Sequence, residues 1–147
     1  MKKLIAAVMI AVLAVTGKAD VEWSWWCENT AESTDISLGI ATKCAKVEAL
    51  ELSLLYGASK VEGVQWSLLG INDSDMSGAL QMSMWFNRGD DPCVQLGLIN
   101  CADTTVFSLG MINVANKATV QLGLLNFNKS GFLSIFPFVN LEKALFD

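Results

Sequence analysis

The chain has 147 residues, of which 52% are hydrophobic and 17% charged, and it contains no histidine. Its 10 basic and 15 acidic residues give a net charge of −5 at pH 7, and the basic residues form no cluster. Because neutralisation of phosphates by lysine and arginine dominates nucleic-acid affinity, this composition argues against a nucleic-acid-binding protein.

Residues 1–19 have the three parts of a secretory signal. Lys2 and Lys3 precede an apolar run from Leu4 to Val15, and small residues lead to Ala19. The run is shorter than the roughly 20 residues that a membrane-spanning helix needs. We therefore predict a signal peptide over residues 1–19, cleaved after Ala19. Its three lysines would leave with it and change the net charge to −8.

Residues 20–35 form an aromatic segment that contains Trp23, Trp25 and Trp26. Alternating aromatic residues are typical of a membrane interface or a sugar site, but also of an apolar cover over the end of a sheet. We predict that this segment is the N-terminal cap of the fold.

Residues 36–131 contain tandem copies of one short phrase, in which apolar, polar, apolar, small and apolar positions follow one another. Val120-Gln121-Leu122-Gly123-Leu124-Leu125-Asn126 is a clear copy, and the polar position recurs every 13 to 16 residues. The polar positions are Ser37, Glu51, Gln65, Gln81, Gln95, Ser108, Gln121 and, in the last copy, Ser134. Apolar residues two positions apart share one face of an extended chain, so each copy predicts a β-strand.

Two architectures fit this repeat. In a β-solenoid of about seven to eight rungs, the copies stack in parallel at about 4.8 Å. In an antiparallel β-meander or small β-barrel, alternate copies reverse direction. We favour the solenoid because Asn100, Asn113 and Asn126 close the clearest copies, and asparagine suits a corner with left-handed backbone.

The two faces of the strands differ in character. We expect the apolar face to form the shared interior and the opposite face, with glutamine, glycine and serine, to be exposed. The glutamines Gln65, Gln81, Gln95 and Gln121 then serve either as a ligand-facing stripe or, as we favour, as an amide ladder between strands. The position two residues later must be small, as at Gly97, Gly110 and Gly123. Residues 132–147 depart from the repeat, contain Pro137 and are predicted to be the C-terminal cap.

Few residues carry recognisable chemistry. Cys27, Cys44, Cys93 and Cys101 allow either two disulfides or buried free thiols in an exported chain. The absence of histidine and of any CxxC pair argues against a zinc site. Asp73, Asp75 and the pair Asp90-Asp91 lack the spacing of a calcium loop, and we interpret them, with Arg88-Gly89-Asp90, as turn residues. We predict no catalytic, metal or cofactor site.

Three features of the sequence resemble the leptospiral-type bacterial surface repeat family: the phrase at residues 120–126, its relatives before it, and the ending Ser130-Gly131-Phe132-Leu133-Ser134-Ile135-Phe136-Pro137-Phe138-Val139-Asn140. The resemblance spans roughly Ser37 to Leu141. It implies an envelope or surface protein without an assigned biochemical activity. We therefore expect a non-enzymatic, exported protein with a structural or interaction role and an unknown protein or envelope partner, located at the cell surface, outer membrane or periplasm. The alternative is a small outer-membrane β-barrel with a transport or anchoring role.

Overall fold

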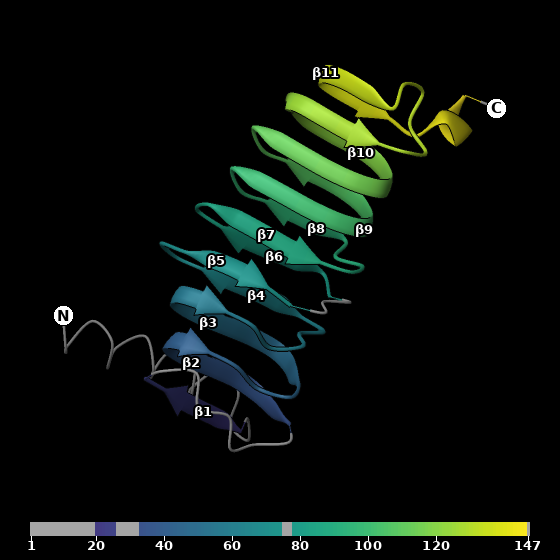
Figure 1. Ribbon diagram of the computed structural model, residues 1–147. Helices are drawn as coiled ribbons and strands as arrows, with labels where there is room; N and C mark the ends of the chain where they lie inside the picture. Colours follow the sequence, from purple (N-terminus) through teal and green to yellow (C-terminus); the bar gives the residue numbers. More distant parts are fainter. Residues whose placement is uncertain (1–19, 26–32, 75–77, 147) are drawn as a thin grey trace.

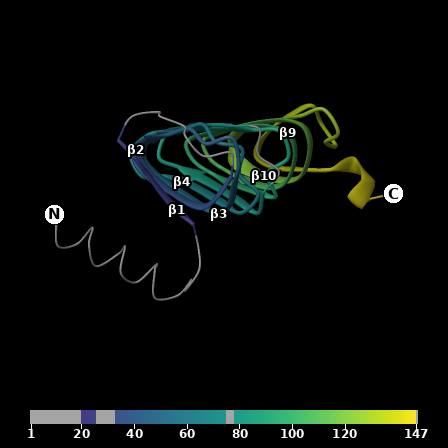
Figure 2. The same cartoon turned by 90° about the horizontal axis from the view of Figure 1, so that it is seen from below.

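The computed structural model of the chain is a single stack of β-strands, and it describes residues 20–25, 33–74 and 78–146. Figure 1 shows the strands climbing from β1 to β11, and Figure 2, turned by 90°, shows the turns superposed into a flattened ring. The predicted signal peptide, Trp26, Cys27 and Asp75 lie outside the described residues. The strands are β1 (Val21–Ser24), β2 (Thr34–Thr42), β3 (Val47–Gly57), β4 (Val64–Ser67), β5 (Ile71–Asp73), β6 (Leu80–Ser83), β7 (Phe86–Gly89), β8 (Val94–Leu96), β9 (Ile99–Leu109), β10 (Ile112–Asn128) and β11 (Ile135–Leu141).

The repeated copies pair in parallel and in register, so the predicted β-solenoid is confirmed. Glu51 of β3 pairs with Gln65 of β4, Gln65 with Gln81 of β6, and Gln81 with Gln95 of β8. A second column pairs β5, β7 and the start of β9 in the same way. Each turn therefore contains two extended segments joined at a corner. Where the chain curves without a break after the second segment, as in β10, that segment and the first segment of the next turn form one long strand. These parallel registers exclude the antiparallel meander and the small barrel.

The solenoid has about 6 turns, fewer than the predicted seven to eight rungs. The difference arises at the C-terminus, where β11 runs antiparallel to β10 and places Asn140 beside Gln121. The copy around Ser134 thus reverses the chain instead of adding a parallel turn. A single 3-10 turn, η1 (Lys143–Leu145), follows β11.

At the other end, the aromatic segment supplies β1, which pairs in parallel with β2 through Val21 and Ile36. The rings of Trp23 and Trp25 meet edge to face with centroids 6.2 Å apart, and both side chains are exposed. These tryptophans therefore lie on the outside of the first strand pair.

The corners explain why one column of the repeat is restricted to small residues. A Cβ atom added to Gly110 would lie 2.3 Å from the carbonyl oxygen of Gly97, and one added to Gly123 would lie 2.2 Å from that of Gly110. The obstacle is backbone of the adjacent turn, which cannot move without breaking the stack. In the earlier turns the same column holds serine, and Ser83 is accommodated there with 6% exposure.

We predict opposite outcomes for two substitutions in this column. Gly110→Ala should lower the free energy of unfolding by about 1–3 kcal/mol, the usual cost of forcing atoms into a packed site. Ser83→Ala should leave it nearly unchanged or raise it, because the buried Ser83 hydroxyl has no hydrogen-bond partner. Denaturant unfolding followed by circular dichroism measures both. Equal tolerance of the two variants would contradict the corner geometry.

Candidate functional site

The interior of the solenoid is lined by amides and hydroxyls, so the predicted orientation of the two faces is wrong. Gln65, Gln81, Gln95 and Gln121 are all 0% exposed, whereas Leu109 and Leu124 are 47% and 53% exposed. Alternation separates the two faces but does not say which of them faces inward. Parallel stacking decides in favour of the polar face because it places equivalent amides one turn apart, where they can bond to each other.

Gln65, Gln81 and Gln95 form a ladder in which each amide donates to the preceding turn, whereas the Gln121 amide donates to the Phe127 carbonyl. Gln81 Nε2 lies 2.9 Å from Gln65 Oε1, and Gln95 Nε2 lies 2.8 Å from Gln81 Oε1. The same two donors also reach the carbonyl oxygens of Arg88 and Cys101. Ser108 interrupts the ladder because its side chain is too short to continue it. Among the described residues, Gln95 Oε1 on one side of Ser108 and Gln121 Oε1 on the other have no hydrogen-bond partner.

Asparagines form a second ladder, which donates in the opposite direction along the stack. Donor–acceptor distances between successive Nδ2 and Oδ1 atoms are 2.7 to 2.9 Å, in the order Asn72, Asn87, Asn100, Asn113 and Asn126. Each amide also donates to a backbone carbonyl near the corner, as from Asn100 to Leu109 O at 2.9 Å and from Asn113 to Leu122 O at 2.9 Å. The ladder therefore joins adjacent turns and satisfies corner carbonyls at the same time.

The fixed spacing assumed for the repeat did not predict that Asn72 and Asn87 belong to the asparagine column. Asn72 pairs with Gly57 and Asn87, and Asn87 pairs with Asn100, so both belong to the asparagine column. Compared with the corner before Asn100, the corner before Asn72 is two residues longer and the corner before Asn87 is one residue longer. Both asparagines are therefore displaced from the position that a fixed spacing predicts. An apolar residue directly before each asparagine, as in Ile71-Asn72 and Phe86-Asn87, was the available signal. The corner asparagines are not left-handed either, since Phe138 is the one non-glycine residue with positive φ in the described part of the chain.

Glu51 occupies the glutamine column as a carboxyl group and is fully buried. It accepts hydrogen bonds from Ser59 Oγ and Gln65 Nε2. Burial raises the pKa of the Glu51 carboxyl, and the bonds from Ser59, Thr42 and Gln65 oppose that shift in part. The folded state therefore holds the Glu51 proton more tightly than the unfolded chain does.

Of the two alternatives left open for the cysteines, disulfides or free thiols, the three cysteines in the described part of the chain are free thiols. Cys44, Cys93 and Cys101 lie in different settings, respectively buried, exposed and half-buried. Cys44 donates to Glu22 and Ser37 inside the first turns. Burial raises the pKa of the Cys44 thiol to about 11, with a smaller contribution from Glu22 in the same direction and a partly opposing one from the hydrogen bond with Ser37. Cys44 is thus held in its protonated form, the opposite of an activated nucleophile.

The outer surface divides into two zones of different chemistry. We define the apolar arc as residues 50–57, 64–72, 80–87, 94–100, 107–113 and 120–126, which include both strands and the corner of each turn. We define the polar edge as the described residues that connect these segments, 58–63, 73–74, 78–79, 88–93, 101–106, 114–119 and 127–130. Glu51 is the one charged residue in the apolar arc, and it points inward.

Every other polar side chain of the apolar arc is also internal, apart from Tyr56. The glutamines, asparagines and serines of the arc are at most 6% exposed. Its outward side chains are instead large and apolar, and Leu69, Met84, Trp85 and Met111 are 53%, 52%, 54% and 49% exposed. Exposed apolar patches of this kind are typical of surfaces that contact a partner or a membrane.

The polar edge collects the charged residues. Arg88 pairs with Asp73 at 3.6 Å, and Asn116 donates to Asp103. Asp90 and Asp91 are exposed at the same edge. Across residues 20–25, 33–74 and 78–146, no group of three or more acidic, cysteine or histidine side chains converges on a point where a metal ion could bind. The described part of the chain also contains no helix of the length and hydrophobicity required to cross a membrane.

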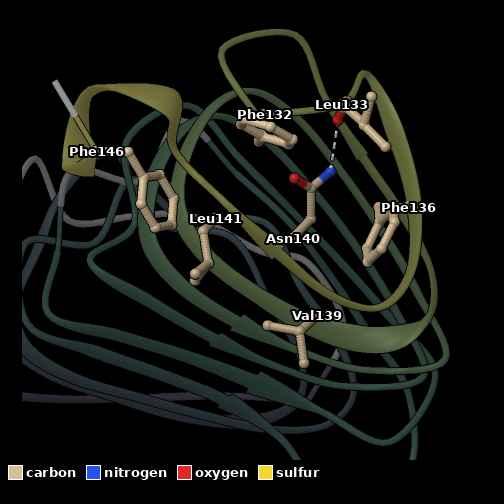
Figure 3. A pocket seen from close by; sticks show the side chains of 7 residues that line it. All are labelled: Phe132, Leu133, Phe136, Val139, Asn140, Leu141 and Phe146. Atoms are coloured by element: carbon tan, nitrogen blue, oxygen red, sulfur yellow. Dashed lines mark hydrogen bonds between the residues drawn. The ribbon is translucent and has the colours of Figure 1, made fainter.

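The C-terminal segment adds an open apolar pocket of about 380 Å³, shown in Figure 3. It is lined by Phe132, Leu133, Phe136, Val139, Asn140, Leu141 and Phe146. Its single polar side chain, Asn140, donates to the Leu133 carbonyl at 3.0 Å. The pocket therefore presents apolar carbon and continues the character of the apolar arc onto the end of the stack.

We predict that Glu51→Gln stabilises the protein in a pH-dependent way. Because the folded pKa of Glu51 is raised, its stabilising contribution is complete below the unfolded pKa of about 4.3 and is lost as pH rises through the folded value. Glutamine carries no charge and matches the ladder at this position. The thermal midpoint of the variant should exceed that of the unmodified protein at pH 8 and approach it at pH 4.

The exposed carboxylate variant Asp91→Asn is the matched control, and it should leave the midpoint unchanged at both pH values. A lower midpoint for Glu51→Gln at pH 8 would show that the buried carboxylate is stabilising in its charged form.

The chain was compared with protein-family models, with curated proteins and with solved structures, and none of the three comparisons gave a match. The resemblance to the leptospiral-type surface repeat family therefore stays a prediction from the repeat phrases.

Proposed function

We propose that this chain is a non-enzymatic, exported protein of a bacterial envelope, and that it acts as a structural or interaction module through its apolar arc. The observation that carries the proposal is the arrangement of every turn from Leu50 to Asn126, with polar side chains inside and large apolar ones outside. A protein of this kind needs an apolar environment or partner to cover its outer surface.

Two features of the sequence support an envelope location. Residues 1–19 have the pattern of a secretory signal, and the repeat phrases resemble those of bacterial surface proteins.

The geometry also supplies little for catalysis. The chain has no histidine, the Cys44 thiol stays protonated, and the inward-facing amides already bond to each other and to backbone. The interior ladders are thus the support of the fold, and the outer surface remains for contact.

The proposed contact surface is the opposite face of the strands from the one that the sequence led us to expect at the exterior. The glutamine, glycine and serine face was expected to be exposed, but the glutamines and serines of the apolar arc are buried and Gly97, Gly110 and Gly123 are half-buried. The apolar arc takes their place, and its corner residues, such as Trp85 and Met111, are the most accessible part of it.

Export and envelope retention test this proposal together. The full-length chain is produced in a bacterial host, and mass spectrometry of the recovered protein should give an N-terminus at Asp20. The double variant Trp85→Asp/Met111→Asp should move most of the protein from the envelope to the soluble fraction. The matched double variant Ala79→Asp/Thr104→Asp adds the same charge at exposed positions of the polar edge and should remain in the envelope.

As a control, circular dichroism and the thermal midpoint of each double variant should show that both variants fold. An uncleaved N-terminus, or equal retention of the two variants in the envelope, would contradict the proposed function.

A further inference from the structure

The apolar arc continues around the solenoid from one sheet, across the corners, to the other sheet. On the sheet formed by the first strands it exposes Trp66 and Leu109, at 39% and 47%. At the corners it exposes residues such as Leu69 and Leu124, and on the sheet formed by the second strands Ile71 and Ile99, each 37% exposed. Along the stack the corners run from Leu54 to Leu124, over five intervals of about 4.8 Å, or about 24 Å. The apolar surface is therefore a ridge, in which the corners form the crest and the outer faces of the two sheets form the two flanks.

A ridge of this shape limits what can cover it. A second copy or another folded protein would cover one flank or the corners, and the opposite flank would stay exposed. Protein interfaces also contain about one hydrogen bond per 100–200 Å², together with a polar rim. The arc offers almost no exposed polar side chain to such a partner. Fluid hydrocarbon can cover both flanks and the corners together, without any directional contact.

The backbone of the ridge is also prepared for an environment without water. In hydrocarbon each backbone polar group must find its partner within the protein. At the corners, Leu68 N donates to Ser53 O at 3.0 Å, and Met111 N donates to Leu98 O at 2.8 Å. Gly110 N and the Asn113 amide both donate to Leu122 O. The inter-turn bonds and the buried asparagines thus satisfy backbone groups that a hairpin corner would leave to solvent.

On these grounds, and given the envelope role proposed above, we propose that the apolar arc is embedded in the acyl chains of one leaflet of a phospholipid bilayer. The charged residues fix the orientation. They occur in every connection of the polar edge, from Lys60 in the first to Lys129 in the last. If the solenoid axis crossed the bilayer, these charges would enter the hydrocarbon. The axis therefore lies in the plane of the membrane, with the corners inserted and the polar edge at the headgroups.

The dimensions and charges agree with a one-leaflet insertion. A four-residue strand such as β4 extends about 13 Å from the polar side to the corner, close to half of the roughly 30 Å hydrocarbon core. The polar edge mixes both signs of charge, for example Lys117 with Asp103 and Arg88 with Asp90. Attraction to anionic headgroups is consequently not required, and the binding should persist on zwitterionic lipid at high salt.

Vesicle flotation with the exported, processed protein tests the proposal directly. The probe is protein-free phosphatidylcholine vesicles, in low salt and in 1 M NaCl. The unmodified protein should float in both conditions, and brominated acyl chains should quench its tryptophan fluorescence. Trp85→Asp/Met111→Asp should weaken binding at least tenfold, whereas Ala79→Asp/Thr104→Asp should bind as the unmodified protein does. Light scattering of the same samples without lipid reports their oligomeric state.

Three outcomes would overturn the lipid assignment. The first is failure of the unmodified protein to float, and the second is equal binding by the two double variants. The third is a lipid-free dimer that Trp85→Asp/Met111→Asp abolishes while vesicles bind neither form, which would make a second copy the occupant of the arc. If vesicles are not bound but envelope retention still depends on Trp85 and Met111, the proposed function stands and its partner is a protein.

Discussion

The hydrogen bond between equivalent side-chain amides on adjacent turns is the interaction on which this structure depends. It is repeated along two columns, through Gln65, Gln81 and Gln95 in one and from Asn72 to Asn126 in the other. Such bonds require parallel, in-register stacking, and they also line the interior with polar groups. In the described part of the chain, most of these buried groups have a hydrogen-bond partner, and the exceptions are Asn72 Oδ1, Ser83 Oγ, Gln95 Oε1 and Gln121 Oε1. The apolar side chains must then face outward. The interior ladder and the apolar exterior are therefore two results of one arrangement.

The sequence was sufficient to predict the strands and the period, because both depend on local alternation and on regular spacing. The parallel stack was favoured over the meander through Asn100, Asn113 and Asn126, although these asparagines do not have the left-handed backbone expected of them. It was not sufficient to predict which face is buried. Leu122 and Gln121 alternate equally well in either orientation, and the usual preference for apolar interiors pointed the wrong way. The fold buries Gln121 because an amide can bond to its neighbours in the stack, which is a relation between turns and not a property of one residue.

The candidate site shows a similar division. The glutamine column and the small column were visible as residues, since their positions repeat, but their inward direction was not. Asn72 and Asn87 were missed because corner length varies between turns, while the pairing of strands does not. Nothing in the sequence distinguished Trp85 and Met111 from the other apolar residues of the repeat, and their exposure at the corners is seen only in the stacked geometry. The reversal of β11 likewise depends on tertiary pairing beyond the repeat.

Exchange of side-chain amide protons, followed by nuclear magnetic resonance after transfer to deuterated water, tests the buried ladder most directly. The ladder predicts that the amides of Gln81, Asn100 and Asn113 exchange slowly, at rates comparable to those of backbone amides in β9 and β10. The exposed Asn116 amide in the polar edge should exchange within the dead time of the measurement. Equally rapid exchange of all these side-chain amides, in a protein whose backbone amides are protected, would contradict the account.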